Sequence, residues 1–217
     1  MTLPTLTYFS SRGRAETIRL VCAEAGVSYH ERNLGVYDAV DKTPAFHALA
    51  ETGVMPFGAV PLWQVSDGFT LAQSDAIVRH VARTHGLYGR DMHEAARCDM
   101  VFAGVEDVRA EVRKLGPAEP ARRGELRAEL ATVTLPRWLA HFERLLDGNG
   151  GGFVVGEAPT FADVALFWLS EYLHDNGFAA AFGSCPRLGV HFAHMAARPG
   201  LARYLASPTR FPVQRLP

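Results

Sequence analysis

Two short groups of residues have the chemical types and the spacing that binding of an anion requires. Tyr8 ends a β-prone run and is followed closely by Arg12 and Arg14. Gln73 and Ser74 follow a later β-prone run and open a helix. A serine hydroxyl, a glutamine amide and the free N–H groups of a helix start hold a carboxylate well, which favours an anionic, peptide-like ligand. In a plainer interpretation, Tyr8 is a half-buried strand aromatic and Ser74 only caps its helix.

The first group must be positioned by a strand, a loop and a helix. Leu3–Phe9 is β-prone, and apolar residues then recur at helical spacing over residues 15–25 until Gly26 ends the run. Val27–Leu34 has the pattern of a second strand. These segments predict a βαβ unit with parallel strands. Because α/β modules bind ligands at loops that leave strand C-termini, Tyr8 is placed where a ligand is expected.

The second group follows a predicted hairpin. Ala59–Val65 and Phe69–Leu71 flank a Ser-Asp-Gly turn, and a helix is expected from Ser74 onward. Pro61, at the entry of the first of these strands, must avoid a central ladder position or adopt a cis bond. Either arrangement frees backbone groups for a ligand.

The other periodic segments are helical. Helices are expected near Phe46–Ala50, at 98–112, at 126–145 with a bend at Pro136, from Thr160 to Asn176, at 186–197 and at 199–205. Thr160 and Asp163 fit a capping box in which an Asp carboxylate takes the place of the usual Glu. The order of elements predicts a domain with a mixed sheet over residues 1–85 and a helical domain over residues 86–217.

The composition is that of an ordinary globular protein. Of 217 residues, 48% are hydrophobic and 21% are charged, and the net charge is -1. This balance gives no electrostatic case for a nucleic-acid partner. Residues 1–9 lack the pattern of a leader, and no segment approaches the ~18 uninterrupted apolar residues of a membrane span. A cytoplasmic protein without a membrane partner is therefore expected.

Neither a disulfide framework nor a metal site is predicted. Cys22, Cys98 and Cys185 are odd in number and far apart, which favours reduced, mostly buried thiols. His191 and His194 are three residues apart on a predicted helix, but no third ligand lies near them in the sequence.

Several motifs taken together resemble the cytosolic glutathione S-transferases of the tyrosine type. They are Tyr8-Phe9, Arg12-Gly13-Arg14-Ala15-Glu16, Val60-Pro61 and Leu71-Ala72-Gln73-Ser74, with pi-like segments at 86–91, 104–109 and 153–163. The resemblance covers nearly the full length and is strongest to the pi and sigma classes. It implies a thioredoxin-like α/β N-terminal domain, an all-α C-terminal domain and a homodimer with two active sites in clefts between domains.

The same resemblance implies a detoxification enzyme that joins the glutathione thiolate to small hydrophobic electrophiles. Tyr8 is expected to donate a hydrogen bond to the glutathione sulfur, with support from Arg14. The residues expected to bind glutathione are Phe46, Val60, Pro61, Gln73, Ser74 and, from the other subunit, Asp107. Phe9 and Ser11 are expected to line the electrophile pocket, which belongs with the helical domain. Glutathione is then a co-substrate, and no cofactor or metal is expected.

The sequence departs from the pi pattern where that pattern contacts the glycyl carboxylate of glutathione. A tryptophan, a lysine and a glutamine of the pattern correspond here to Phe46, Thr52 and Ala59. Lys42 and His47 are candidates to replace the missing polar contacts. In the electrophile pocket, Pro117 falls near the position of a tyrosine in the pi pattern.

Three other functions fit parts of this pattern. Ser10 and Ser11 occupy the loop from which other classes of the superfamily present a serine or cysteine to the sulfur, so a serine-type enzyme is one alternative. A glutathione-fold binding or structural protein without turnover is a second. A glutathione-dependent isomerase or peroxidase, which uses the same thiolate, is a third.

Overall fold

A computed structural model describes residues 2–38, 40–150, 152–213 and 215–216. Contacts between residues divide the chain into two compact units, one of residues 1–85 with 199–214 and one of residues 86–198 with 215–217. The C-terminal residues 199–214 therefore group with the N-terminal unit. No local pattern in the sequence indicates that grouping.

The first unit is built on a four-stranded sheet in the order β2-β1-β3-β4. Its strands are β1 (Thr5–Tyr8), β2 (His30–Asn33), β3 (Leu62–Gln64) and β4 (Thr70–Ala72). β1 and β2 are parallel, whereas β3 is antiparallel to both β1 and β4. The predicted βαβ unit and the predicted hairpin are thus confirmed, with strands shorter than their apolar runs.

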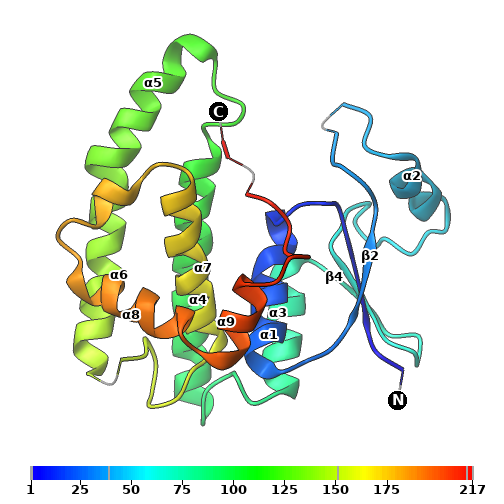
Figure 1. The fold of residues 1–217 in the computed structure, drawn as a ribbon, viewed down its shortest axis with the longest axis horizontal. Helices are drawn as coiled ribbons and strands as arrows, with labels where there is room; N and C mark the ends of the chain where they lie inside the picture. The colour runs from blue at the N-terminus through cyan, green and yellow to red at the C-terminus, as the bar shows by residue number, and fades with distance from the viewer. Residues whose placement is uncertain (1, 39, 151, 214, 217) are drawn as a thin grey trace. The chain divides into compact units, whose positions relative to one another are not determined.

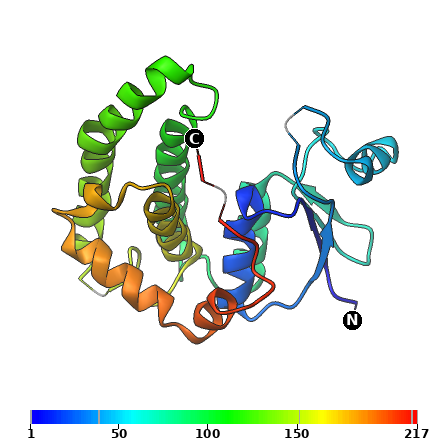
Figure 2. The ribbon, with the colours of Figure 1, turned by 45° about the horizontal axis from the view of Figure 1, so that its top comes forward.

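The first unit also contains helices. They are η1 (Gly13–Ala15), α1 (Glu16–Ala25), α2 (Pro44–Glu51), α3 (Ser74–Thr84) and α9 (Pro199–Leu205). α1 packs against α3, and α9 packs against the side of α1 that faces away from the sheet (Figures 1 and 2). α1 ends as predicted at Gly26, whose φ of 68° lies in the left-handed region that glycine adopts without strain.

The second unit is helical. It contains α4 (Met92–Arg113), α5 (Pro120–Glu129), η2 (Leu130–Thr134), α6 (Leu135–Asn149), α7 (Phe161–Asp175), η3 (Ala179–Phe182) and α8 (Pro186–Ala196). Residues 161–170 of α7 are all buried, and α7 packs against α4 and α8. The predicted fold class, a thioredoxin-like α/β domain followed by an all-α domain, is confirmed.

The start of α7 confirms the predicted capping box. One oxygen of the Asp163 carboxylate accepts hydrogen bonds from Thr160 N at 2.9 Å and from Thr160 Oγ1 at 2.8 Å. The other oxygen accepts a hydrogen bond from Val154 N at 2.7 Å. The carboxylate thereby satisfies N–H groups that a helix start leaves unpaired.

The predicted bend near Pro136 takes the form of a π-helical turn. Residues 130–134 are π-helical between α5 and α6, and Pro136 lies in the first turn of α6. A proline inside an α-helix lacks an N–H donor and clashes with the carbonyl four residues earlier, so a wider turn before Pro136 relieves both problems. Within the described parts of the chain, no helix combines the length and the apolar character needed to cross a membrane.

Candidate active site

The ends of the strands bring the two predicted polar groups to one edge of the sheet. Thr7 of β1 lies opposite Leu62 of β3, and Leu62 lies opposite Ala72 of β4. At the next position of the same register, Tyr8 lies opposite Pro61, and Pro61 lies opposite Gln73. The two groups are 65 residues apart in the sequence, and the antiparallel pairing through β3 is what places them side by side.

The hydroxyl of Tyr8 is held by the loop that follows β1. Arg14 N donates a hydrogen bond to Tyr8 Oη at 3.0 Å. Gly13 has a φ of 43°, and a Cβ atom on it would lie 2.6 Å from Tyr8 Oη. Only glycine therefore allows the loop to close against the phenol. Among the described residues, Tyr8 Oη donates a hydrogen bond to no acceptor, so its O–H can donate to a ligand.

Gln73 and Ser74 lie where β4 passes into α3. Gln73 has a φ of 70°, which is rare for a residue other than glycine, and strained positions of this kind cluster at binding sites. No side chain caps α3, and Ser74 is the first residue of the helix rather than its cap. The interpretation of Ser74 as a helix cap is therefore wrong. Its hydroxyl donates to Asp75 Oδ1 at 3.1 Å and lies beside the unpaired N–H groups of the helix start.

Val60 and Pro61 precede β3 at the same sheet edge. The Val60–Pro61 peptide bond is cis. Among the described residues, the backbone N–H and C=O of Val60 have no hydrogen-bond partner, which leaves both for a peptide-like ligand.

The aromatic residues near Tyr8 are mostly packed into a core. Phe9 stacks on Phe46 with ring centroids 5.7 Å apart and meets Tyr37 edge to face at 5.0 Å. Phe9 and Phe46 are only 5% and 7% exposed. Phe46 as a glutathione contact, and Phe9 with Ser11 as lining of the electrophile pocket, stay predictions. In this structure Ser11 is 3% exposed.

Lys42 lies above this aromatic group. Its Nζ is 5.3 Å from the centroid of the Tyr37 ring and 5.5 Å from that of Phe46. Lys42 has a φ of 51°, and no carboxylate among the described residues forms an ion pair with it. His47 is instead engaged with Asp41, whose backbone oxygen lies 2.9 Å from His47 Nε2.

The other departures from the pi pattern lie on the surface. Thr52 follows α2, and its hydroxyl donates to Leu49 O at 2.7 Å. Ala59 is exposed in the loop before β3. Neither residue offers a cation, which leaves Lys42 as the cation of this region that has no acidic partner among the described residues.

Ser10 is committed to the fold of the loop. Its hydroxyl donates to Asn33 Oδ1 at 2.8 Å, and Gly35 N donates to the same oxygen at 2.8 Å. Ser10 N in turn donates to Gly35 O at 2.8 Å. These bonds connect the loop after β1 to the loop after β2.

Asp107 lies on α4 in the helical unit and is exposed, while its neighbours Val105 and Val108 are buried. Met100, Ala103 and Ala110 are also exposed. Because residues 100, 103, 107 and 110 follow helical spacing, they share one face of α4.

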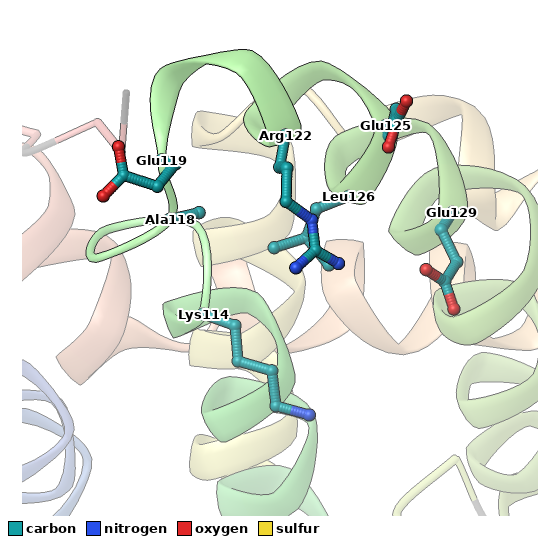
Figure 3. Close-up of a pocket in the computed structure, with 7 residues that line it drawn as sticks. All are labelled: Lys114, Ala118, Glu119, Arg122, Glu125, Leu126 and Glu129. Carbon is teal, nitrogen blue, oxygen red and sulfur yellow. The ribbon is translucent and has the colours of Figure 1, made fainter.

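Pro117 lies between α4 and α5, and the next residue, Ala118, is one of those that line a hollow in the helical unit (Figure 3). The hollow is lined by Lys114, Ala118, Glu119, Arg122, Glu125, Leu126 and Glu129. Figure 3 shows charged side chains around most of its rim. A lining of this kind suits water or ions better than a hydrophobic electrophile. The place of the electrophile pocket stays a prediction.

The three cysteines are buried thiols. Burial raises the pKa of Cys98 to about 11, and it also raises the pKa values of Cys22 and Cys185. None of them has the environment of a reactive thiol. Among the described residues, no three His, Cys, Asp or Glu side chains group as metal ligands.

Sequence reasoning missed a group of charged residues beneath the Tyr8 loop. Glu16 is 0% exposed and is bound by Arg19, Tyr204 and Arg210. A Glu and an Arg three residues apart among apolar neighbours in α1 was the available signal. The two C-terminal partners, about 190 residues away, gave no signal of their own.

Comparisons with known proteins agree with this architecture. Residues 4–83 match the family model of the glutathione S-transferase N-terminal domain, and residues 106–208 match that of the C-terminal domain. The chain is 36% identical over 206 residues to glutathione S-transferase P of Bos taurus, covering 94% of this chain and 92% of that protein. It is 32% identical to glutathione S-transferase alpha-2 of Rattus norvegicus, covering 93% and 87%. The crystal structure of the glutathione S-transferase from Ascaris lumbricoides superposes with a TM-score of 0.82 at 28% identity, covering 98% of each chain.

The chain therefore belongs to the glutathione S-transferase family and is a glutathione-conjugating transferase. The predicted membership is confirmed. The higher identity to transferases named P than to those named alpha agrees with the predicted likeness to the pi class.

Proposed function

We propose that this transferase ionises glutathione through Tyr8, whose O–H donates a hydrogen bond to the glutathione sulfur. The observation that carries the proposal is a phenol held by Arg14 N at 3.0 Å and confined by Gly13. The N–H bond to the phenolic oxygen polarises the O–H, which makes it a stronger donor. The thiolate then attacks a small hydrophobic electrophile.

The energy of one such bond is sufficient for the task. A free thiol ionises near pKa ~8.5 and is only a few per cent thiolate at neutral pH. A hydrogen bond to a charged acceptor contributes ~1.5–3 kcal/mol, which lowers the pKa of the thiol by about 1–2 units. Thiolate is then a major species at neutral pH. The positive charge of Arg14 acts in the same direction.

The peptide part of glutathione is proposed to lie along the sheet edge. The free backbone groups of Val60, next to Pro61, pair with the cysteinyl residue. The hydroxyl of Ser74 and the unpaired N–H groups of α3 hold the γ-glutamyl carboxylate, with Gln73 beside them.

The glycyl carboxylate is proposed to bind Lys42. This ammonium lies over the rings of Tyr37 and Phe46 with no acidic partner among the described residues. It would take the place of the cation that Thr52 does not supply. Phe46 contributes by packing, because its ring carries no polar atom.

The dimer supplies the remaining contact. The exposed face of α4 carries Met100, Ala103 and Ala110 around Asp107, and a small, apolar face of this kind suits close approach of a second copy. Phe57, 68% exposed before β3, adds a second apolar group. We propose a homodimer in which Asp107 of the partner subunit binds the γ-glutamyl amine. We also propose a cytoplasmic enzyme that needs no cofactor besides its co-substrate.

Two substitutions test the role of Tyr8. Tyr8→Phe is expected to lower kcat/KM with an aryl halide by about 10- to 150-fold, the equivalent of ~1.5–3 kcal/mol. Ser11→Ala is the matched control and is expected to keep most activity. The reverse result, with activity lost in Ser11→Ala and kept in Tyr8→Phe, would establish the serine-type mechanism instead.

A binding protein without turnover is the second candidate, because Phe46, Thr52 and Ala59 lack the polar groups of the pi pattern. Calorimetric titration with glutathione, beside the conjugation assay, separates the candidates. Glutathione binding without conjugation would favour the binding protein. Lys42→Ala is expected to weaken glutathione binding about tenfold or more, since a charged contact contributes ~1.5–3 kcal/mol. Unchanged affinity would remove Lys42 from the site.

A further inference from the structure

The Glu16 carboxylate joins the start of α1 to the C-terminal segment, residues 204–211. Tyr204 Oη donates to Glu16 Oε2 at 2.9 Å, and Arg210 Nε donates to Glu16 Oε1 at 2.9 Å. Arg19 Nη1 lies 3.3 Å from Glu16 Oε2. The side chain of Glu16 is 0% exposed and those of Arg19 and Arg210 are 2% and 7% exposed, so these groups interact out of contact with most water.

The same network continues into the loop that holds the Tyr8 phenol. Arg19 Nη1 donates to Ser11 O at 2.9 Å and to Arg12 O at 3.3 Å. Arg12 Nε donates to Phe211 O at 2.8 Å. The Arg19 guanidinium also lies 4.7 Å from the centroid of the Phe211 ring and 5.9 Å from that of Tyr8. Two consecutive carbonyls of the loop are therefore fixed by a side chain that the C-terminal segment holds in place.

The network also buries the positive charge of Arg19 close to the Tyr8 ring. Arg19 Nη2 lies 2.7 Å from the carboxylate of Glu31, and Arg19 also forms an ion pair with Glu16, which Arg12 and Arg210 contact as well. Burial alone would lower the pKa of Arg19, but its hydrogen bond to Glu31 and the charges of both carboxylates raise it, so Arg19 stays charged. A positive charge buried under Tyr8 favours a thiolate at the Tyr8 hydroxyl.

Stability alone does not account for this arrangement. Buried ion networks cost so much desolvation that well-packed apolar residues often stabilise a fold as well or better. The start of α9, directly before this segment, is docked without these charges: Leu201 is 0% exposed, and a Cβ on Gly200 would overlap the Ala23 carbonyl oxygen. Figures 1 and 2 show α9 lying along α1. Because Arg19 of this network binds the carbonyls of the Tyr8 loop, the network is better explained by a role in the active site.

We infer that the C-terminal segment is a positioning element of the active site, which acts through Glu16 and Arg19 to hold residues 10–14 against the Tyr8 phenol and to keep positive charge beneath it. The inference rests on the proposed role of Tyr8. It predicts that groups about 200 residues from Tyr8 in sequence tune the ionisation of bound glutathione without touching it.

Arg210→Ala and Tyr204→Phe test the inference, with Arg203→Ala, an exposed arginine of α9, as the matched control. The readouts are the ultraviolet absorbance of the thiolate of bound glutathione and the pH profile of kcat/KM with an aryl halide. Arg210→Ala is expected to move the apparent pKa of the bound thiol up by about one unit and to lower kcat/KM at neutral pH about tenfold. KM for glutathione is expected to stay within about twofold, because no contact to glutathione is lost. Tyr204→Phe removes a single hydroxyl. It is expected to raise the apparent pKa of the bound thiol by a smaller amount and to lower kcat/KM at neutral pH about threefold.

The inference is overturned if the pH profiles of Tyr204→Phe and Arg210→Ala superpose on those of the parent protein and of Arg203→Ala. This holds even if both variants unfold more easily. If Arg210→Ala does not fold, Tyr204→Phe decides alone. Tyr8→Phe, measured in parallel, separates the two proposals. A shifted profile in Tyr8→Phe with none in the C-terminal variants overturns only the inference. An unshifted profile in Tyr8→Phe overturns the proposed role of Tyr8 and the inference with it.

Discussion

Glu16 in the α/β unit and Asp163 in the helical unit are both fully buried carboxylates, but their partners differ in kind. Asp163 accepts hydrogen bonds from Thr160 and Val154, which lie within nine residues of it and form its capping motif. Among the described residues, its only hydrogen-bond partner from farther away is His191, whose Nε2 lies 3.2 Å from Asp163 Oδ1. Glu16 is neutralised by cations and a phenol, of which Tyr204 and Arg210 come from the far end of the chain. A local capping motif needs only its own segment to form, whereas the Glu16 network exists only once the C-terminal segment has docked.

The largest effect is expected from Glu16→Gln. The amide removes the negative charge and leaves Arg19 and Arg210 buried with one fewer anion, which is expected to lower the free energy of unfolding by about 3–5 kcal/mol. Chemical denaturation measures the change. Glu51→Gln, an exposed glutamate at the end of α2, is the control and is expected to be neutral. A loss below about 1 kcal/mol in Glu16→Gln would mean that the network relaxes into water.

Asp163→Asn is expected to cost somewhat less, about 2–3 kcal/mol, because its amide NH2 takes the place of one carboxylate oxygen. The groups bound there, either the two donors of Thr160 or Val154 N with His191 Nε2, then lose their acceptor. Denaturation again gives the value. Thr160→Val, which removes only one of the donors, should cost about 1 kcal/mol. A larger loss in Asp163→Asn than in Glu16→Gln would reverse the contrast between the two carboxylates.

Gly13→Ala is expected to affect the active site of the α/β unit directly. A Cβ would lie 2.6 Å from Tyr8 Oη, so the phenol must move and conjugation is expected to fall about tenfold, or ~1.4 kcal/mol. Gly26→Ala is the control, because it has a similar positive φ of 68° and nothing within 4 Å of its Cβ. Both variants lose stability from backbone strain, so equal activity losses would show that strain alone is responsible.

The smallest effect concerns Cys98, which lies beside the capping box and interacts with Thr160 and Asp163. Burial raises its pKa from the ordinary value of 9.0 to about 11, so the unfolded chain loses this proton first as pH rises. The stabilising contribution is complete below pH ~9 and is lost as pH rises towards 11, by about 1 kcal/mol at pH ~10. Denaturation of the parent protein and of Cys98→Ala at pH ~8 and ~10 tests this. The variant should show the shallower decline, and parallel declines would contradict it.

The sequence predicted those structural features that form from residues within a single short segment. The helix of α7 with its Thr160 and Asp163 cap, the stop of α1 at Gly26 and the hairpin turn all depend on interactions within a few residues, and each was predicted. The bend at Pro136 was predicted in place, but its form as a π-helical turn was not, because several backbone geometries relieve the same clash.

The candidate site was predictable in part. The motifs around Tyr8 and Gln73 identified the family, and helical spacing placed Asp107 on α4. The interpretation of Ser74 as a cap failed because Gln73 adopts a left-handed conformation that no propensity favours. Lys42 has its place over the rings of Tyr37 and Phe46 only in the folded unit.

By itself, the sequence determined the order of helices and strands, the local caps and the chemical types available at the sheet edge, because these depend on short-range geometry and side-chain chemistry. The tertiary structure alone decided which of these residues meet. It aligned Tyr8, Pro61 and Gln73 through the register of β3, and it brought Tyr204 and Arg210 to Glu16. Contacts of this kind form between distant segments, where packing and burial of the whole unit, rather than any local preference, select the partner.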